Sequence, residues 1–362
     1  MTANPKTILI TGGAGFIGCE LSSRLVARGE RVTVLDILHP QVHHDEGRPP
    51  RLHQDVTLLP VDVTAKAGWA ATLRTVHPDC VVHLAAETGT GQSLTEASRH
   101  AMVNVVGTTR MTDALMAGGA VPPHVVLASS RAVYGEGLWV RNGQTFSPGA
   151  RSHTALTEGR WIPGGDGSGR ERPIASAAAT TPTLPTSVYG VTKLAQEGVL
   201  RSWCSAMGSA LSILRLQNVY GPGQSLGNSY TGIVTLFASQ ARQGREIDLY
   251  EDGGIIRDFV YVDDVVDAMV AAIDQPPTES RTVDIGSGEQ TVVADLAGML
   301  AVRMDAPSPV VSGRFRDGDV RAAFADTSEA ARDLAWERRT SLDAGVDALL
   351  SWMEPELNGA GQ

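Results

Sequence analysis

A short apolar run that leads directly into a glycine-rich turn is the feature that most restricts how this chain can fold. Residues 7–11 read TILIT, and the glycines Gly12, Gly15 and Gly18 follow with the spacing GxxGxxG. A helical pattern then covers residues 16–28. A strand, a tight turn and a helix in this order predict a dinucleotide site, because the turn lets the backbone and the helix N-terminus approach a pyrophosphate.

Acidic residues at the ends of two later strands refine this prediction. Asp36 follows the apolar run 31–35, at about the spacing expected for the acid that binds the cofactor ribose. A carboxylate there accepts hydrogen bonds from ribose hydroxyls and repels a 2′-phosphate, so we predict NAD rather than NADP. Asp62, in LPVDVT, is a second candidate that could reach the adenine, and its alternative role is an ordinary strand end or helix N-cap.

Apolar runs of strand length recur along the chain with helical stretches between them. After the first two, they cover 80–84, 124–129, 211–216 and 281–285. Strands that alternate with helices predict an α/β fold with a doubly wound parallel sheet, buried on both faces.

The spacing of these runs suggests two lobes. We predict an NAD-binding domain over 1–217 and a smaller, mainly substrate-binding lobe over 218–362, from which 255–285 returns to the sheet. Residues 138–186 are rich in Gly, Pro, Ser, Thr and Ala, and they predict a surface insertion that serves as a lid or a linker.

Composition excludes several classes of partner. The 362 residues carry a formal net charge of -10, which disfavours nucleic acid and anionic membranes as partners. No apolar run approaches the length of a membrane span. The three cysteines, Cys19, Cys80 and Cys204, have no metal-binding spacing, so we predict no metal site and a reducing, cytoplasmic location.

A tyrosine and a lysine stand four residues apart in YGVTK, where a helix would place Tyr189 and Lys193 on one face. An ammonium beside a phenol favours the phenolate, and Tyr189 would then act as a general base. Ser130 directly follows the strand 124–129, at the sheet edge where ligands gather in such folds, and its hydroxyl could bind the reacting oxygen. We predict that these three residues carry the chemistry.

The motifs together resemble those of the extended short-chain dehydrogenases/reductases of the NDP-sugar epimerase/dehydratase type, which have a Rossmann-type fold. They extend from the first strand beyond residue 326 and comprise TGGAGFIG, HLAAETG, VNVVGT, SSRAVYG, YGVTK, RLQNVYGPGQ, RDFVYVDDV and FRDGDVRAAFAD. The resemblance implies that Ser130, Tyr189 and Lys193 are catalytic. It also implies a cofactor site formed by Gly12, Gly15, Phe16, Ile17, Gly18, Asp36, Asp62, Val63, Leu84, Ala85, Ala86, Asn104, Tyr189 and Lys193.

The same resemblance predicts how a nucleotide sugar is held. Arg257 and Arg316 match the family's diphosphate-binding positions, since a guanidinium binds phosphate bidentately, and Asn218 matches a further diphosphate contact. The predicted substrate-binding residues are Glu87, Thr88, Thr90, Ser130, Arg131, Asn218, Arg257 and Arg316, with Arg321 and Asp326 as weaker candidates. Relatives pair through two helices, so a homodimer is expected, with one helix after Tyr189 and the other near 94–117.

The resemblance also bears on the reaction. Dehydratases of the family carry acids just after the catalytic hydroxyl residue, whereas Arg131 and Ala132 stand there in this chain. This favours NAD-dependent 4-epimerisation through a transient 4-keto sugar. The chain most resembles the dTDP-L-rhamnose 4-epimerase-like branch, although its insertion lacks the cysteine pairs often found there. The alternatives are a 2-epimerase, decarboxylase, dehydratase or oxidoreductase acting on a sugar nucleotide, or a non-catalytic NAD or nucleotide sensor.

Overall fold

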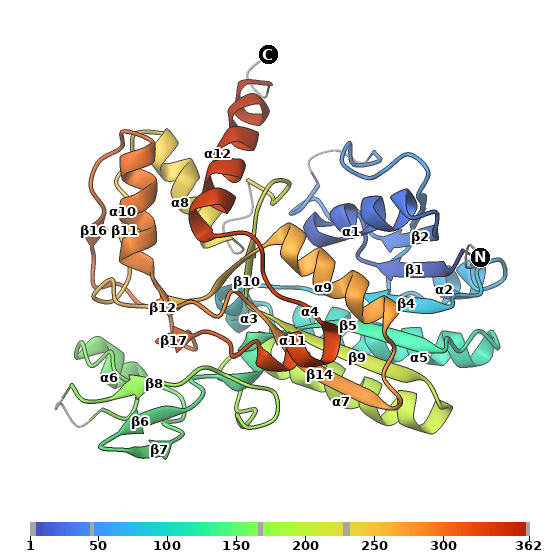
Figure 1. Cartoon of the computed structure of the whole chain (residues 1–362), viewed down its shortest axis with the longest axis horizontal. Coiled ribbons are helices and arrows are strands. Elements are labelled where there is room, and N and C mark those ends of the chain that lie inside the picture. The colour runs from blue at the N-terminus through green and yellow to red at the C-terminus, as the bar shows by residue number, and fades with distance from the viewer. Residues whose placement is uncertain (1–4, 44–46, 166–168, 227–231, 360–362) are drawn as a thin grey trace.

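Seven parallel strands form the central sheet of the computed structural model, which describes residues 5–43, 47–165, 169–226 and 232–359 (Figure 1). Their order across the sheet is β14-β9-β5-β4-β1-β2-β3. The strands are β1 (Thr7–Thr11), β2 (Arg31–Asp36), β3 (Thr57–Pro60), β4 (Cys80–His83), β5 (His124–Ser130), β9 (Ala210–Leu216) and β14 (Ser280–Ile285). The order reverses beside β1, and ligands of such sheets bind at the carboxyl ends of the strands around that point.

Helices cover both faces of this sheet, which explains why its strands are apolar without alternation. Ile8 and Ile10 of β1 pack toward one face, and Leu9 packs toward the other. The first face is covered by α1 (Phe16–Ala27), α9 (Val262–Asp274) and α11 (Ser328–Leu334). The second is covered by α2 (Lys66–Thr72), α5 (Gly107–Ala117) and α7 (Val188–Met207).

A second hydrophobic core lies beyond the carboxyl ends of the strands. Phe237, Leu296 and Leu349 are among its buried side chains. Its elements are β10 (Asn218–Tyr220), α8 (Ile233–Arg242), β11 (Asp248–Leu249), β12 (Ile256–Arg257), β13 (Phe259–Tyr261), β15 (Thr291–Val292), α10 (Val293–Arg303), β16 (Val310–Val311), β17 (Ala322–Ala323) and α12 (Leu342–Gly359). Two elements from the same part of the sequence, α9 and β14, do not belong to this second core but pack with the central sheet (Figure 1).

The predicted insertion has structure of its own. It contains β6 (Trp139–Arg141), β7 (Gln144–Phe146), α6 (His153–Thr157) and β8 (Arg172–Pro173), and the three strands pair in the order β7-β6-β8. Arg151 fixes the segment through buried ion pairs with Glu136 at 2.8 Å and with Glu251 of the second lobe at 2.7 Å. This segment therefore packs as a small subdomain against the second lobe, a feature that its composition did not predict.

One irregular helix runs beside α7. It consists of α3 (Thr90–Thr95), α4 (Ala97–His100), a π-helical turn (Ala101–Val106) and α5. The wider π turn contains Asn104, whose side chain is completely buried. None of the helices described is long and apolar enough to cross a membrane.

Candidate active site

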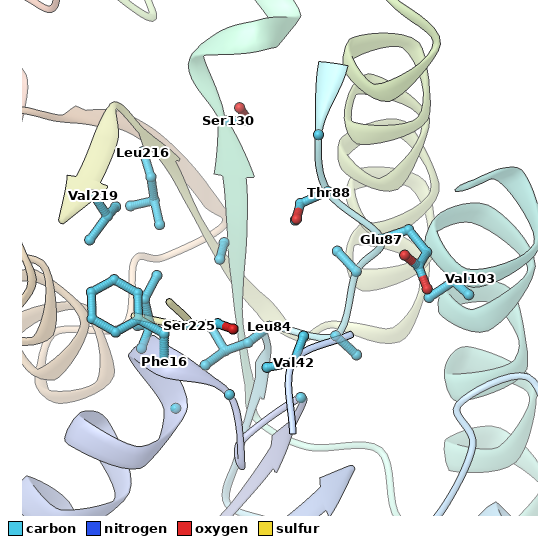
Figure 2. Close-up of a pocket in the computed structure, with 18 of the residues that line it drawn as sticks. Phe16, Val42, Leu84, Glu87, Thr88, Val103, Ser130, Leu216, Val219 and Ser225 are labelled. Carbon is cyan, nitrogen blue, oxygen red and sulfur yellow. The ribbon is translucent and has the colours of Figure 1, made fainter. Parts of the chain in front are cut away.

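A cavity of about 640 Å³ opens at the carboxyl ends of β1, β2, β4, β5 and β9. Figure 2 shows Ser130 and Thr88 at one end of it and Phe16, Val42 and Leu84 at the other. Most of the predicted residues line it: Gly12, Gly15, Phe16, Ile17, Gly18, Asp36, Asp62, Val63, Leu84, Ala85, Ala86, Glu87, Thr88, Thr90, Ser130, Arg131, Tyr189, Lys193 and Asn218. The topology thus brings together residues from both halves of the chain.

The glycine-rich turn is shaped by two close backbone contacts. Gly12 has a φ of +68°, and a Cβ there would lie 2.7 Å from the backbone of Ala85. A Cβ on Gly18 would lie 2.4 Å from Gly13 Cα. Gly15 precedes α1 without a side-chain cap, so the first turn of the helix presents its N–H groups to the cavity. This cradle fits the pyrophosphate of a dinucleotide.

Asp36 is held at the end of β2 by two backbone groups. Its Oδ2 accepts from the Ala14 N–H at 3.0 Å, and its Oδ1 accepts from the Leu38 N–H at 2.9 Å. These bonds orient the carboxylate at the cavity, where it suits a ribose. Asp62 also lines the cavity, but its Oδ1 accepts from both the backbone and the hydroxyl of Thr64 at 2.8 Å, so it has a turn-forming role as well.

The catalytic candidates lie where a turn packs against the start of a helix. Ser130 ends β5 and caps the 3-10 turn Arg131–Tyr134 by accepting from the Ala132 N–H at 3.2 Å. Tyr189 lies in the first turn of α7, and its backbone N–H donates to Ser93 Oγ at 3.1 Å. A Cβ on Gly190 would lie 2.5 Å from Ala132 O, so glycine allows the turn and the helix to approach this closely.

The electrostatics differ from the expectation for Lys193. Burial raises the pKa of Tyr189, and the Ser130 hydroxyl and the Arg131 guanidinium act in the opposite direction. Lys193 Nζ donates to Ala128 O at 2.9 Å. Burial lowers the pKa of Lys193 to about 8, against a raising effect of Glu197. The lowering of the Tyr189 pKa by Lys193 that the spacing predicts is therefore not what this structure shows.

Some predicted residues lie outside the cavity lining. Asn104 is buried behind it, where Oδ1 accepts from the Glu87 N–H at 2.8 Å and Nδ2 donates to Glu87 O at 3.0 Å. Arg257 is almost fully buried and pairs with Asp319 at 2.7 Å. Arg316 lies over the Tyr250 ring, at 5.1 Å from its centroid.

The two weaker candidates also have structural partners. Arg321 pairs with Glu251 at 2.8 Å and with Asp252 at 2.6 Å. Asp326 Oδ1 accepts from the Ser328 N–H at 2.9 Å. His83, expected to be a core residue, is buried in β4 with Nδ1 at 2.6 Å from Thr11 Oγ1, and burial lowers its pKa to about 3.

Sequence reasoning missed several side chains that line the cavity. They come from the loop after β2, from α4 and the π turn, from the residue after β9 and from the second lobe: His39, Gln41, Val42, His43, Arg99, Val103, Gln217, Gln224, Ser225, Ile233, Val234 and Phe259. None belongs to the glycine-rich turn over residues 12–18 or to the spacing of Tyr189 and Lys193. Gln217 and Asn218 are adjacent in RLQNVYG, so the motif was the one available signal for Gln217.

Comparison with known proteins agrees with this geometry. Residues 8–286 match the model of the NAD dependent epimerase/dehydratase family. The chain is 53% identical over 355 residues to a dTDP-L-rhamnose 4-epimerase of Burkholderia thailandensis, covering 98% of this chain and 96% of the relative. It is 29% identical over 343 residues to a UDP-glucose 4-epimerase of Mycolicibacterium smegmatis, covering 93% and 95%.

Solved structures give the same result. The UDP-glucose 4-epimerase of Thermotoga maritima with UDP-glucose aligns with a TM-score of 0.77 and 27% identity, covering 97% of this chain and 99% of that one. The Thermus thermophilus UDP-glucose 4-epimerase complex with NAD aligns with a TM-score of 0.75 and 26% identity, covering 96% and 98%. The predicted fold class, NAD as cofactor and an enzyme of the epimerase type are confirmed, and this chain belongs to the NAD dependent epimerase/dehydratase family.

Proposed function

We propose that this protein is a nucleotide-sugar 4-epimerase that acts on a dTDP-6-deoxyhexose such as dTDP-L-rhamnose. The observation that carries the proposal is the 53% identity to a dTDP-L-rhamnose 4-epimerase over nearly the whole of both chains. The cavity supports it, because Ser130, Tyr189 and Lys193 line one volume with Asp36 and the glycine-rich turn. Arg131 and Ala132 stand where an acid would serve a dehydratase, and neither can exchange protons with the sugar at neutral pH.

The residues divide the work as follows. NAD, when bound, would be the acceptor and the donor of the hydride. Tyr189 takes the proton of the C4 hydroxyl, and Ser130 hydrogen-bonds the same oxygen. Lys193 lies one helical turn after Tyr189 and binds the nicotinamide ribose. Asp36 accepts from the adenosine ribose, and the first turn of α1 binds the pyrophosphate. Arg257, Arg316 and Asn218 bind the substrate diphosphate.

The two lobes suit this division. We assign residues 1–217 to the cofactor domain and 218–362 mainly to the substrate lobe, with 255–285 in the central layer. The cavity between them has lining residues from β2 and β5 on one side and from α8 and β13 on the other. A sugar nucleotide bound there would contact both lobes.

The experiment is incubation of the purified protein with dTDP-L-rhamnose and no added NAD, followed by proton NMR. The H4 couplings report the configuration at C4, so a C4-inverted product establishes 4-epimerisation with a retained cofactor. Net accumulation of NADH would identify an oxidoreductase. A product altered at C2, or one that has lost CO2 or water, would identify one of the other sugar-nucleotide reactions. No turnover of any NDP-sugar with NAD supplied would leave the sensor as the function.

A homodimer in a reducing compartment completes the proposal. Val191 of α7 is 52% exposed and Met102 of the adjacent π turn is 51% exposed, so two neighbouring helices carry apolar side chains on the surface. Burial of such a face against its copy would form a four-helix interface.

The cysteines bear on the compartment. Cys19, Cys80 and Cys204 are all unpaired and buried, which suits the cytoplasm.

A further inference from the structure

Residues 314–321 connect the second lobe to the edge of the cavity, and we call them the arginine segment. Arg316 lies over the Tyr250 ring of the second lobe, with its guanidinium carbon 5.1 Å from the ring centroid. A Cβ on Gly91 would lie 3.8 Å from Arg316 Cδ, and the residue before it, Thr90, lines the cavity. Among the residues that the structure describes, no carboxylate forms an ion pair with Arg316. The segment therefore brings an unpaired cation to the edge of the cavity.

The arginine segment is held from the inserted subdomain by Arg151, whose side chain is only 3% exposed. Its Nη2 donates to Asp319 O at 3.0 Å, and its Nη1 donates to Trp161 O at 3.2 Å. Nε and Nη1 also pair with Glu136 and Glu251. One planar guanidinium thus joins the insertion, the second lobe and the arginine segment, and its fixed fork of donors sets the geometry of all three.

Asp319 extends this contact to the predicted diphosphate site. Its backbone oxygen accepts from Arg151, while its carboxylate pairs with Arg257 at 2.7 Å. The same carboxylate oxygen accepts from the Val320 N–H at 2.9 Å, which fixes its orientation. The position of the Arg257 guanidinium therefore depends on Asp319, and the position of Asp319 depends on Arg151.

Further contacts hold the middle of the arginine segment. His153 Nδ1 lies 3.0 Å from a carboxylate oxygen of Asp317, and the His153 ring packs edge-on against Phe315 with the ring centroids 5.5 Å apart. Thr186, in the loop before α7, donates from Oγ1 to Gly318 O at 3.0 Å. The segment is thus fixed between the insertion and the loop that leads to the catalytic helix.

We propose that the inserted subdomain is a positioning element of the substrate site, with Arg151 as its central residue. Arg151 and His153 hold the arginine segment so that Arg316 and Arg257 face the diphosphate of a sugar nucleotide. The structure describes both Arg151 and His153 and places them outside the cavity lining, so they act through the segment and not by contact with the substrate. This inference rests on the proposed function only in taking a nucleoside diphosphate as part of the ligand.

The test measures the affinity of the NAD-loaded protein for dTDP and for UDP by calorimetry, which needs no turnover. Arg151→Lys keeps a positive charge beside the two buried carboxylates, but its single nitrogen cannot reproduce the planar fork of donors. We expect Arg151→Lys to weaken binding about tenfold, and His153→Ala, at a side chain that is 72% exposed, to weaken it about threefold. Arg160→Gln is the matched control in the same subdomain, because Arg160 pairs at the surface with Glu158, and it should bind as the wild type does.

Two further measurements separate positioning from a general loss of stability. Hydrogen exchange should become faster for the amides of residues 314–321 in both variants, while the amides of α1 and the amount of retained NAD stay as in the wild type. In turnover of dTDP-L-rhamnose, KM should rise by the factor measured in calorimetry, with a much smaller change in kcat.

The outcomes that would overturn the proposal are distinct. Wild-type affinity in both variants, despite faster exchange in the arginine segment, would show that the segment has no part in binding. Equal losses of dTDP and NAD binding would show that the insertion supports the whole fold instead. If Arg151→Lys does not fold, His153→Ala at the surface decides between these results. A wild type that binds dTDP or UDP but converts no dTDP-L-rhamnose would contradict the proposed function, and the affinity comparison would still decide this inference.

Discussion

Asn104 and Glu87 are joined by two hydrogen bonds, in which the side-chain amide of Asn104 accepts from the backbone N–H of Glu87 at 2.8 Å and donates to its backbone oxygen at 3.0 Å. The same amide also donates to Thr192 Oγ1 at 2.9 Å. Asn104 thus fixes the loop that lines the cavity against α7, and the π turn is what places its side chain there. The family motif suggested direct contact with the cofactor, whereas the structure places Asn104 behind the cavity lining.

Asn104→Ala should therefore impair catalysis through the loop. We expect a fall in the free energy of unfolding of about 1–3 kcal/mol, because a buried backbone N–H loses its partner, and at least a tenfold fall in kcat. Thermal unfolding and steady-state kinetics measure the two effects. Thr109→Ala on the same helix, which removes only a local bond to Val106 O, is the control. Unchanged kcat in Asn104→Ala would show that the loop does not depend on this contact.

Gly190→Ala tests the approach of α7 to the catalytic turn. A Cβ there would lie 2.5 Å from a backbone oxygen and 2.9 Å from Pro185 Cβ, so the first turn of the helix must move. We expect kcat to fall more than about tenfold, since a displacement of Tyr189 by a fraction of an ångström weakens its geometry with Ser130. Gly298→Ala on α10, where nothing lies within 4 Å, should instead stabilise the protein by about 0.5–1 kcal/mol. Equal activity of both variants would contradict this account of Gly190.

Arg257→Gln tests the prediction that this residue binds diphosphate. Asp319 forms an ion pair with its guanidinium, so a diphosphate must compete with that carboxylate or share the cation with it. We expect the affinity of the NAD-loaded protein for dTDP to fall about 10–100-fold by calorimetry, the effect of losing a charge-assisted contact. Arg303→Gln, whose partners lie on α12, should bind dTDP as the wild type does. Unchanged affinity in Arg257→Gln would remove Arg257 from the substrate site.

The buried carboxyl of Asp284 should make the free energy of unfolding of the protein depend on pH. Both of its oxygens accept from the Tyr134 hydroxyl, at 2.7 Å and 2.9 Å, and burial raises its pKa from the ordinary value of 3.8 to about 7. A carboxyl whose pKa is higher in the folded state stabilises that state fully below about pH 4, and this contribution is lost as the pH rises to about 7.

Denaturant unfolding near pH 5 and near pH 8 measures this effect. Relative to Asp284→Asn, the wild type should lose about 1–3 kcal/mol of unfolding free energy between these conditions. Asp347→Asn at the surface is the control and should parallel the wild type, because its side chain is 66% exposed. If Asp284→Asn shows the same pH dependence as the wild type, this carboxyl does not titrate in that range.

Val191→Glu tests the proposed homodimer. A carboxylate in an apolar helix face opposes its own copy across a two-fold axis, so we expect the mass measured by light scattering to fall from dimer to monomer. Val302→Glu, at a residue that is 84% exposed on α10, should remain dimeric. A wild-type monomer would refute the homodimer, and a dimeric Val191→Glu would refute this face.

The parts of the molecule that could be predicted from the sequence are those that depend on residues close together in the chain, namely the strands, the glycine-rich turn and the start of α7. Buried parallel strands are apolar runs, and the close approach of Gly12 to Ala85 can only be made by glycine, so both leave a clear signature. The positions of Ser130, Tyr189 and Lys193 around one cavity followed from strand-end and helical spacing.

Partners that are distant in the chain left no such signature. The pairing of Arg257 with Asp319 joins residues of two separate motifs, and each motif alone suggested a ligand contact. The position of Lys193 against Ala128 O depends on how α7 crosses β5, which spacing within YGVTK does not specify. The loop that contributes Gln41 and Val42 to the cavity has no periodic pattern, so it could not be assigned to the site.

The ion cluster centred on Arg151 has a consequence for the history of this fold. Glu136 precedes the inserted segment, Arg151 lies within it, and Glu251 and Arg321 belong to a different lobe. A descendant that deleted the segment would lose Arg151. The buried carboxylates of Glu136 and Glu251 would then have only Arg321 between them. Gain or loss of residues 138–186 must therefore be accompanied by changes at Glu136 and Glu251, and these positions should vary together with the segment in an alignment of relatives.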